Sequence, residues 1–260
     1  MDLGYKDKVT IVTGGTKGIG EGIVRILAEE GAKVVMVNRV GNEGPVIEKE
    51  LTAKGQHVHY IAAELTQIDE CRRVVEETLS RYGRIDSIFN NAGVNNQLGL
   101  DTPPEKFLQG MADNLIHVYS LVHYAHDELI KNKGSIVNVG SHVSITGQGN
   151  TSAYVAAKGA MAGLTREWAA YFADKYVTVN CVVPGSVWTN AYKVWAARFP
   201  NPEERRKQAE RNIPMGRRMT EVDEFASLAV FVGSPRASHL TGEIIVCDGG
   251  YSRLDRVLTS

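Results

Sequence analysis

Three side chains with the chemistry for proton transfer lie close together along the chain. Tyr154 and Lys158 are four residues apart, and Ser141 precedes the tyrosine by thirteen positions. If a helix begins near Ser152, a separation of four places the phenol and the ammonium on one helical face. A nearby cation favours the phenolate and lowers the phenol pKa from its reference value of about 10. The spacing predicts acid–base chemistry by Tyr154 on a substrate oxygen that Ser141 polarises, although Tyr-x-x-x-Lys alone also arises by chance.

The composition narrows the class of protein. The chain has 260 residues, 43% of them hydrophobic and 23% charged, and a net charge of −1. This balance gives no sign of nucleic-acid binding, no apolar run is long enough to cross a bilayer, and the start lacks the pattern of a signal peptide. The few separated cysteines fit neither a disulfide framework nor a zinc site: Cys71, Cys181 and Cys247. We therefore expect a cytoplasmic protein without a metal centre.

The positions of the β-branched runs predict a doubly wound α/β fold. Strands are expected at residues 9–12, 34–37, 58–61, 87–89, 136–139, 177–180 and 244–246. Helical patterns alternate with them near residues 18–30, 47–51, 67–82, 104–131, 152–174 and 221–233. This alternation is typical of a parallel sheet with helices on both faces. We expect one domain over residues 1–260.

A long stretch over residues 187–215 interrupts this alternation. Insertions of this length in a compact domain are usually lids or binding loops. Its aromatic residues Trp188, Tyr192 and Trp195 are better candidates for lid contacts than its charged run at residues 203–207. We expect that charged run to be a solvated surface.

A glycine-rich segment directly follows the first expected strand. Residues 13–20 read Thr-Gly-Gly-Thr-Lys-Gly-Ile-Gly and open the first helix. Glycines at such a turn let the backbone approach a pyrophosphate, which the positive end of the helix dipole attracts. The placement between a strand and a helix predicts a dinucleotide site.

Together these motifs resemble the short-chain dehydrogenase/reductase family. The glycine spacing is Gly-x-x-x-Gly-x-Gly, and Asn-Asn-Ala-Gly at residues 90–93 follows the fourth strand. Ser141, Tyr154 and Lys158 complete the pattern in the right order. The resemblance covers nearly the whole chain, since Pro-Gly and Asp-Gly-Gly motifs follow the last two strands at residues 184–185 and 248–250.

The resemblance implies a seven-stranded Rossmann sheet, nicotinamide-dependent redox chemistry on alcohols and carbonyls, and a homotetramer. It assigns Asn114 as a fourth catalytic residue, which supports a proton relay to Lys158. Glu64 replaces the usual aspartate after the third strand, and Gly140 replaces a commoner serine. The predicted cofactor contacts are Gly14, Thr16, Lys17, Gly18, Ile19, Gly20, Asn38, Arg39, Glu64, Leu65, Asn91, Ala92, Gly93, Tyr154, Lys158, Pro184, Gly185, Val187 and Thr189.

The end of the second strand favours NADP over NAD. A carboxylate there would bind the ribose 2′-hydroxyl and repel a 2′-phosphate, whereas this chain has Asn38 and Arg39. Arg39 and Lys17 can each pair with a 2′-phosphate. NAD stays open as the alternative, because Asn38 also suits a hydroxyl and Arg39 also suits a solvated turn.

The segment between Ser141 and Tyr154 indicates a polar substrate. Residues 142–152 are rich in polar groups, and such groups discriminate in favour of polyhydroxylated ligands. Four fragments resemble the bacterial L-fucose dehydrogenase branch of the family: residues 147–152, 164–169, 234–239 and 248–251. This similarity implies oxidation of an aldopyranose at C1 to its lactone. From pocket position alone, the predicted sugar contacts are Asn95, His142, Gln148, Asn190 and Trp195.

Two other functions stay open at this point. A 3-oxoacyl-carrier-protein reductase or general carbonyl reductase shares every catalytic motif named above. A protein that senses NADP(H) without turnover is an alternative of a different class. The presence of all four predicted catalytic residues, Asn114, Ser141, Tyr154 and Lys158, argues against the sensor.

Overall fold

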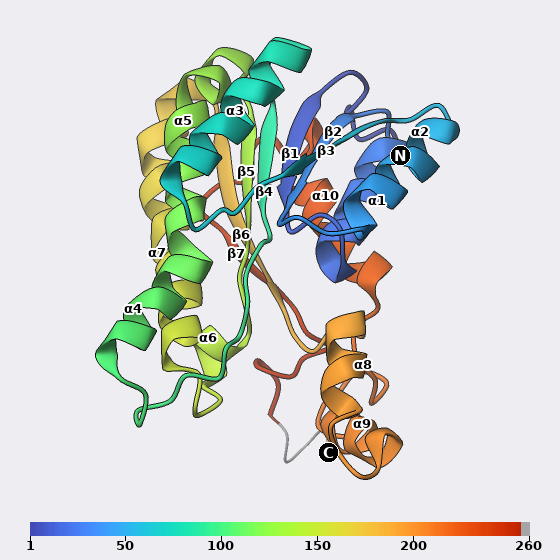
Figure 1. Cartoon of the computed structure of the whole chain (residues 1–260), viewed down its shortest axis with the longest axis vertical. Helices are drawn as coiled ribbons and strands as arrows, with labels where there is room; N and C mark the ends of the chain where they lie inside the picture. The colour runs from blue at the N-terminus through green and yellow to red at the C-terminus, as the bar shows by residue number, and fades with distance from the viewer. Residues whose placement is uncertain (256–260) are drawn as a thin grey trace.

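The chain folds into a parallel β-sheet between two layers of helices, which confirms the predicted fold class (Figure 1). The computed structural model describes residues 1–255, so the last five residues of the predicted domain, 256–260, lie outside the described part. The sheet has seven strands in the order β3-β2-β1-β4-β5-β6-β7. These are β1 (Val9–Thr13), β2 (Lys33–Asn38), β3 (His57–Ala62), β4 (Ser87–Asn90), β5 (Ser135–Val139), β6 (Thr178–Pro184) and β7 (Ile244–Cys247).

Two groups of helices cover the two faces of the sheet (Figure 1). One face carries α3 (Ile68–Tyr82), α5 (His117–Asn132) and α7 (Ser152–Phe172). The other carries α1 (Gly18–Glu29), α2 (Glu43–Ala53) and α10 (Val222–Val232). Shorter helices lie around the carboxyl ends of the strands: α4 (Pro104–Met111), α6 (Val143–Thr146), α8 (Asn190–Ala196) and α9 (Pro202–Glu210). The helix predicted over residues 104–131 is α4 and α5 joined by a π-helical turn, Ala112–Ile116.

Burial on both faces explains why the strands are nearly continuous apolar runs. Every residue of β1 is buried. Because side chains alternate between faces, Ile11 packs in the core beneath α3, α5 and α7, and Val12 packs in the core beneath α1 and α10. All seven predicted strands are present, since β-branched residues fit a pleated sheet that is covered on both sides.

The strand order reverses between β1 and β4, and hydrogen bonds tie the two strands together there. The Thr13 hydroxyl accepts the backbone N–H groups of Asn91 and Ala92, each at 3.0 Å. The Asn91 amide donates to the Thr13 carbonyl at 2.9 Å. Ligands of open α/β sheets bind outside the carboxyl ends of the strands at such a switch point. The loops after β1 and β4 are therefore held side by side where a dinucleotide is expected.

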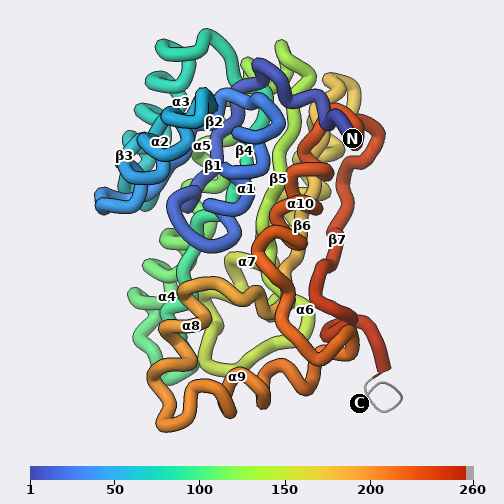
Figure 2. The backbone as a smooth tube through the Cα atoms, turned by 90° about the vertical axis from the view of Figure 1, so that its right-hand side faces the viewer, coloured from blue at the N-terminus to red at the C-terminus, as the bar shows by residue number. Residues whose placement is uncertain are grey.

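The insertion predicted over residues 187–215 contains α8 and α9, which lie together at the carboxyl end of the sheet (Figure 2). The ring centroids of Trp195 and Phe199 are 5.0 Å apart. Arg205 from α9 lies 5.0 Å from the Trp195 ring and 4.7 Å from the Phe199 ring, and Arg206 lies 4.1 Å from the Trp188 ring. The expectation of a solvated charged run holds for Glu203, Glu204 and Lys207, which are exposed. It is wrong for the two arginines, which lie over the aromatic rings.

We expect Asp86 to be a main anchor of the amino edge of the sheet. This residue is 6% exposed, and its carboxylate accepts the Val9 N–H at 2.9 Å, the Lys8 ammonium at 3.1 Å and the Arg84 guanidinium at 2.6 and 2.8 Å. Asp86→Ala should lower the free energy of unfolding by about 2–3 kcal/mol, because it leaves the buried Val9 N–H unpaired. Urea unfolding measures the loss. Asp127→Ala, at a site whose side chain is 93% exposed, should change it by less than about 0.5 kcal/mol; equal losses would contradict the role of Asp86.

Candidate active site

The glycine-rich loop forms a cradle against the first turn of α1. Gly14 and Gly18 have φ values of +64° and +54°, which favour glycine. A Cβ atom on Gly20 would lie 2.2 Å from the Gly14 carbonyl oxygen, so a side chain there would not fit. The loop thus brings backbone close to the positive end of the α1 dipole, an arrangement that fits a pyrophosphate.

The segment after β6 faces this loop. A Cβ atom on Gly18 would lie 3.1 Å from Cγ2 of Thr189, the residue that precedes α8. A Cβ atom on Gly185 would lie 2.6 Å from Cβ of Asp248, so only glycine lets the chain pass the turn after β7. Val187 is buried. The cofactor contacts predicted over residues 184–189 are therefore brought next to those predicted over residues 14–20.

The end of β2 also touches the glycine-rich loop. The Asn38 side-chain amide donates to the Thr16 hydroxyl, and Asn38 Oδ1 accepts the Arg39 N–H at 2.9 Å. Arg39 is exposed. The Lys17 ammonium, a predicted partner of a 2′-phosphate, instead lies 2.8 Å from the Glu43 carboxylate. Sequence reasoning missed Glu43, whose only signal is an acidic residue in the first turn of the helix after β2.

The predicted adenine contacts after β3 are arranged differently. The Glu64 carboxylate accepts the Thr66 N–H at 3.3 Å and the Thr66 hydroxyl at 3.0 Å. It therefore closes its own turn. Leu65, the next predicted contact, is a buried core residue. Glu64 lies near the carboxyl end of the sheet, but its carboxylate is hydrogen-bonded to Thr66 of the same turn.

The predicted proton-transfer residues converge between β5 and α7. Ser141 and Lys158 are 7% and 3% exposed, and the Ser141 hydroxyl hydrogen-bonds the Tyr154 phenol. The Lys158 ammonium donates to the Val139 carbonyl at 2.7 Å and lies 5.8 Å from the centroid of the Tyr154 ring. Helix α7 begins at Ser152, as expected, and therefore places the phenol and the ammonium on one face.

Burial dominates the acid–base properties of this set. It raises the pKa of the Tyr154 phenol, and the hydrogen bond from Ser141 offsets only part of that rise. It also lowers the pKa of the Lys158 ammonium to about 8. In the protein alone the tyrosine pKa is therefore raised and not lowered as the spacing predicted, because burial outweighs the neighbouring charge. The physical reason is that desolvation disfavours the phenolate and the ammonium alike.

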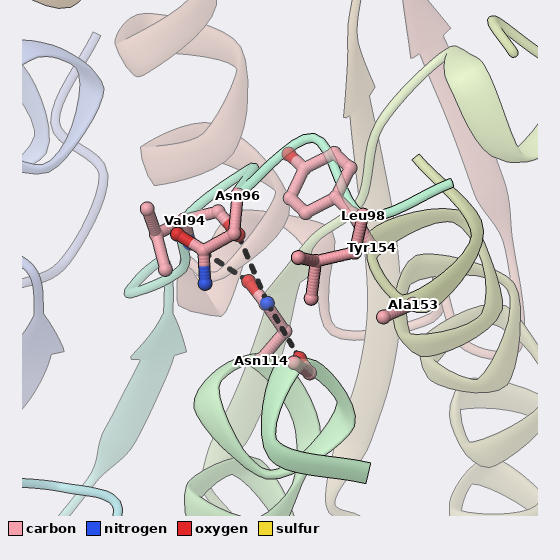
Figure 3. Close-up of a pocket in the computed structure, with 7 residues that line it drawn as sticks. Val94, Asn96, Leu98, Asn114, Ala153 and Tyr154 are labelled. Atoms are coloured by element: carbon pink, nitrogen blue, oxygen red, sulfur yellow. Dashed lines mark hydrogen bonds between the residues drawn. The ribbon is translucent and has the colours of Figure 1, made fainter. Parts of the chain in front are cut away.

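Asn114 reaches the same place from the π-helical turn (Figure 3). Its side-chain amide donates to the Gly110 carbonyl at 2.8 Å and to the Val94 carbonyl at 3.0 Å, and its Oδ1 accepts the Val94 N–H at 2.8 Å. The amide thus bonds the carbonyl that the residue 114 N–H would bond in a regular helix. A Cβ atom on Gly93 would lie 2.9 Å from Asn114 Oδ1 and 3.4 Å from the Lys158 ammonium. The side chains of Asn114 and Lys158 therefore both lie close to the backbone of Gly93.

A small pocket opens beside the tyrosine (Figure 3). The segment between β4 and α4 contributes three of the seven residues that line it, and sequence reasoning missed these three, Val94, Asn96 and Leu98. They show no signal in a single sequence, because an irregular segment has no periodicity. The lining residues are Val94, Asn96, Leu98, Gly110, Asn114, Ala153 and Tyr154.

None of the predicted sugar contacts is among the residues that line this pocket, and the structure brings only some of them together. The Asn95 amide donates to the Gln148 side-chain oxygen at 3.4 Å on an exposed rim. The His142 ring packs edge-on against Tyr251, with centroids 5.4 Å apart. Asn190, the first residue of α8, is exposed. Trp195 is engaged within the aromatic cluster of the insertion, as described above.

A buried histidine that the motifs did not single out lies beside the lysine. His117, the first residue of α5, is 1% exposed. Burial first, and the Lys158 charge second, lower its pKa to about 4, so the imidazole is neutral at physiological pH. It hydrogen-bonds the backbone of Ala92, whereas its Nε2 atom has no hydrogen-bond partner among residues 1–255. The site therefore has a floor of three titratable side chains whose pKa values burial shifts, His117, Tyr154 and Lys158.

Known proteins are similar to this chain in sequence and in fold. Residues 14–252 match the family profile described as Enoyl-(Acyl carrier protein) reductase. The chain is 36% identical over 252 residues to L-fucose dehydrogenase from Bos taurus, and the match covers 96% of this chain and 91% of that one. The crystal structure of Cj0485 dehydrogenase is 40% identical, with a TM-score of 0.96 and full coverage of both chains. The ligand-free aldohexose dehydrogenase of Thermoplasma acidophilum is 27% identical, with a TM-score of 0.88 and 98% coverage of both.

These similarities show that the chain belongs to the short-chain dehydrogenase/reductase family. It is a nicotinamide-dependent oxidoreductase, which agrees with a glycine cradle that side chains would block. Within residues 1–255, no group of three or more His, Cys, Asp or Glu side chains is placed to hold a metal ion. No helix in that range has the length and apolar character needed to cross a membrane.

We expect His117 to make the stability depend on pH below neutrality. The unfolded chain protonates this histidine near its reference pKa of about 6.5, whereas the folded chain holds the pKa at about 4. Its contribution is therefore complete above pH 6.5 and is lost as the pH falls toward 4, by about 2 kcal/mol at pH 5. Urea unfolding at pH 7 and pH 5 should show this difference in the wild type and not in His117→Gln.

His57 provides the matched control for this measurement, because it is an exposed histidine at the start of β3. His57→Gln should lose as much stability between pH 7 and pH 5 as the wild type. An equally steep loss in His117→Gln would show that the buried imidazole is not the group responsible.

Proposed function

We propose that this enzyme oxidises the C1 hydroxyl of an aldopyranose similar to L-fucose to the lactone, and that NADP is its favoured cofactor. The observation that carries the proposal is the likeness to L-fucose dehydrogenases over nearly the whole chain. The likeness to an aldohexose dehydrogenase of known structure supports the same substrate class. The convergence of Asn114, Ser141, Tyr154 and Lys158 supports turnover rather than binding alone.

The chemistry requires a hydride acceptor and a proton acceptor. A bound nicotinamide supplies the hydride acceptor. The Tyr154 phenolate takes the proton of the C1 hydroxyl, and Ser141, already hydrogen-bonded to the phenol, orients the same oxygen. Lys158 stabilises the phenolate electrostatically, although burial makes this side chain a weaker cation than an exposed lysine. Asn114 fixes the Val94 segment and supports the proton relay to Lys158.

The cofactor preference follows from the end of β2. Residue 38 is an asparagine and not a carboxylic acid, and the next residue, Arg39, has an exposed side chain. A guanidinium pairs with a phosphate through two parallel hydrogen bonds, which favours a 2′-phosphate over a hydroxyl. Arg39 is the better candidate for this contact, because Lys17 is already paired with Glu43.

The rim of the pocket suits a ligand with several hydroxyl groups. Asn95 and Gln148 meet there, and their amides offer both donors and acceptors. The His142 ring packs edge-on against Tyr251. Asn190 lies at the start of α8 and is exposed. We propose these side chains as sugar contacts, with Trp195 as an apolar wall of the insertion.

We also propose a homotetramer in a reducing cytoplasm. A Cβ atom placed on Gly159 or Gly163 of α7 would meet no other atom within 4 Å, so a second helix can approach closely there. Tyr119 on α5 and Tyr171 on α7 are about half exposed, and their rings are of the kind that packs favourably between subunits. The cysteines are unpaired thiols among residues 1–255, as a reducing compartment requires.

Replacing Tyr154 by phenylalanine should remove the proton acceptor and leave the fold intact. We expect turnover to fall about 1,000-fold or more, while NADPH binding, measured by fluorescence titration, changes less than about twofold, since the pyrophosphate cradle is unaltered. Tyr176→Phe removes a tyrosine hydroxyl at a site that is 72% exposed and should retain full activity. Retained turnover in Tyr154→Phe would overturn the assigned role.

A substrate panel separates the proposed function from its rivals. L-fucose, D-glucose and a 3-oxoacyl thioester are each offered with NADP(H) and with NAD(H), and the nicotinamide absorbance is followed. We expect kcat/KM for L-fucose to exceed that for the thioester by at least about 100-fold, because the polar rim leaves groups unpaired against an acyl chain. Thioester reduction without sugar oxidation would identify an acyl reductase. Cofactor binding without turnover of any substrate would identify a sensor.

A further inference from the structure

An ion pair joins the two loops at the adenosine end of the cofactor site. Lys17 is the last residue before α1, and Glu43 is the first residue of α2. The Lys17 ammonium lies 2.8 Å from the Glu43 carboxylate, and their side chains are 61% and 50% exposed. Contact with Lys17 lowers the pKa of Glu43, so the carboxylate is charged at neutral pH.

The ion pair lies beside the place where the ribose 2′ position is expected. The Asn38 amide bonds the Thr16 hydroxyl, which brings the glycine-rich loop against the end of β2. In sheets of this type the group at the end of β2 faces the 2′ position. A Cβ atom on Gly41 would lie 2.9 Å from the second carboxylate oxygen of Glu43, so this carboxylate leans over the turn that follows Arg39.

We propose that Glu43 limits the preference for NADP by neutralising Lys17, which leaves Arg39 as the cation that selects the 2′-phosphate. The charges of Arg39 and Glu43, on the two sides of the turn, then have opposite effects on the binding of a 2′-phosphate. Arg39 has no carboxylate partner among residues 1–255 and attracts a phosphate. Glu43 repels a phosphate and compensates the charge of Lys17. The enzyme therefore uses both dinucleotides. This inference rests on the proposed cofactor site and not on the identity of the sugar.

The balance of charges fixes the direction and approximate size of the effect. Glu43→Gln removes one negative charge and frees one positive charge, and both changes favour a dianionic 2′-phosphate. The pair is exposed, so water and salt weaken the gain, and we expect about fivefold tighter binding at low ionic strength. A 2′-hydroxyl carries no charge, and its binding should change less than about twofold. The gain should shrink at about 0.5 M salt, where the Debye length falls well below about 10 Å.

The test uses ADP-ribose and 2′-phospho-ADP-ribose as probes on the full chain, with dissociation constants from titration calorimetry. Glu43→Gln should tighten the phosphorylated probe about fivefold and leave ADP-ribose unchanged. Arg39→Gln should weaken the phosphorylated probe selectively. Lys17→Gln alone should weaken the phosphorylated probe, because it leaves the Glu43 carboxylate uncompensated. In the Glu43→Gln background it should cancel the gain, so that the double variant binds this probe like the wild type.

Glu105 is the matched control, since it is an exposed acidic residue in the first turn of another helix, α4. Glu105→Gln should leave both probes unchanged, which excludes a general effect of removing one negative charge. An unchanged ratio of the two affinities in Glu43→Gln, or equal tightening of both probes, would overturn the role of Glu43. Failure of the wild type to bind either probe would instead overturn the nucleotide site itself. Both probes lack nicotinamide, so these results do not depend on sugar oxidation.

Discussion

A buried lysine ammonium is the constraint around which the rest of the site is arranged. Lys158 is 3% exposed, and its ammonium donates a hydrogen bond to the Val139 carbonyl at the end of β5. Taking an ammonium out of water is costly, and the lowered pKa of about 8 reports that cost. Such a group persists only where the surrounding fold holds it in place. Strand β5, helix α7 and the loop after β4 all contribute to holding it.

The fold holds the Lys158 ammonium by bringing backbone segments close to it. Gly93 must lack a side chain because Asn114 Oδ1 and the Lys158 ammonium occupy that space. Gly140, which departs from the commoner serine, is explained in the same way. A Cβ atom there would lie 2.9 Å from the Cys181 sulfur and 3.0 Å from a Val183 methyl group. Close packing at the carboxyl edge of the sheet therefore needs glycines at these two positions, and it brings the proposed catalytic side chains together.

Local sequence patterns predicted the parts of this molecule that depend on local physics. The strands, the glycine-rich turn and the Tyr154–Lys158 spacing each follow from periodicity or from glycine conformation over a few residues. Contacts between distant segments had no such signal. Lys17 pairs with Glu43, and Arg205 stacks on the Trp195 ring. Folding brings these surface groups together, and no local pattern marks them as partners. The raised phenol pKa was missed because burial, which a spacing does not reveal, outweighs a neighbouring charge.

The floor and the rim of the pocket differ in burial and in the kind of side chain that they contain. The floor contains His117, Tyr154 and Lys158, whose burial concentrates electrostatic effects on one oxygen of any alcohol or carbonyl. The rim contains exposed amides such as Asn95 and Gln148, which lie on irregular segments and carry no part of the core. Rim residues can therefore change without disturbing the floor. A chain that matches a profile described by an acyl reductase can therefore also be similar to sugar dehydrogenases, because one fold and one set of buried groups can serve different substrates.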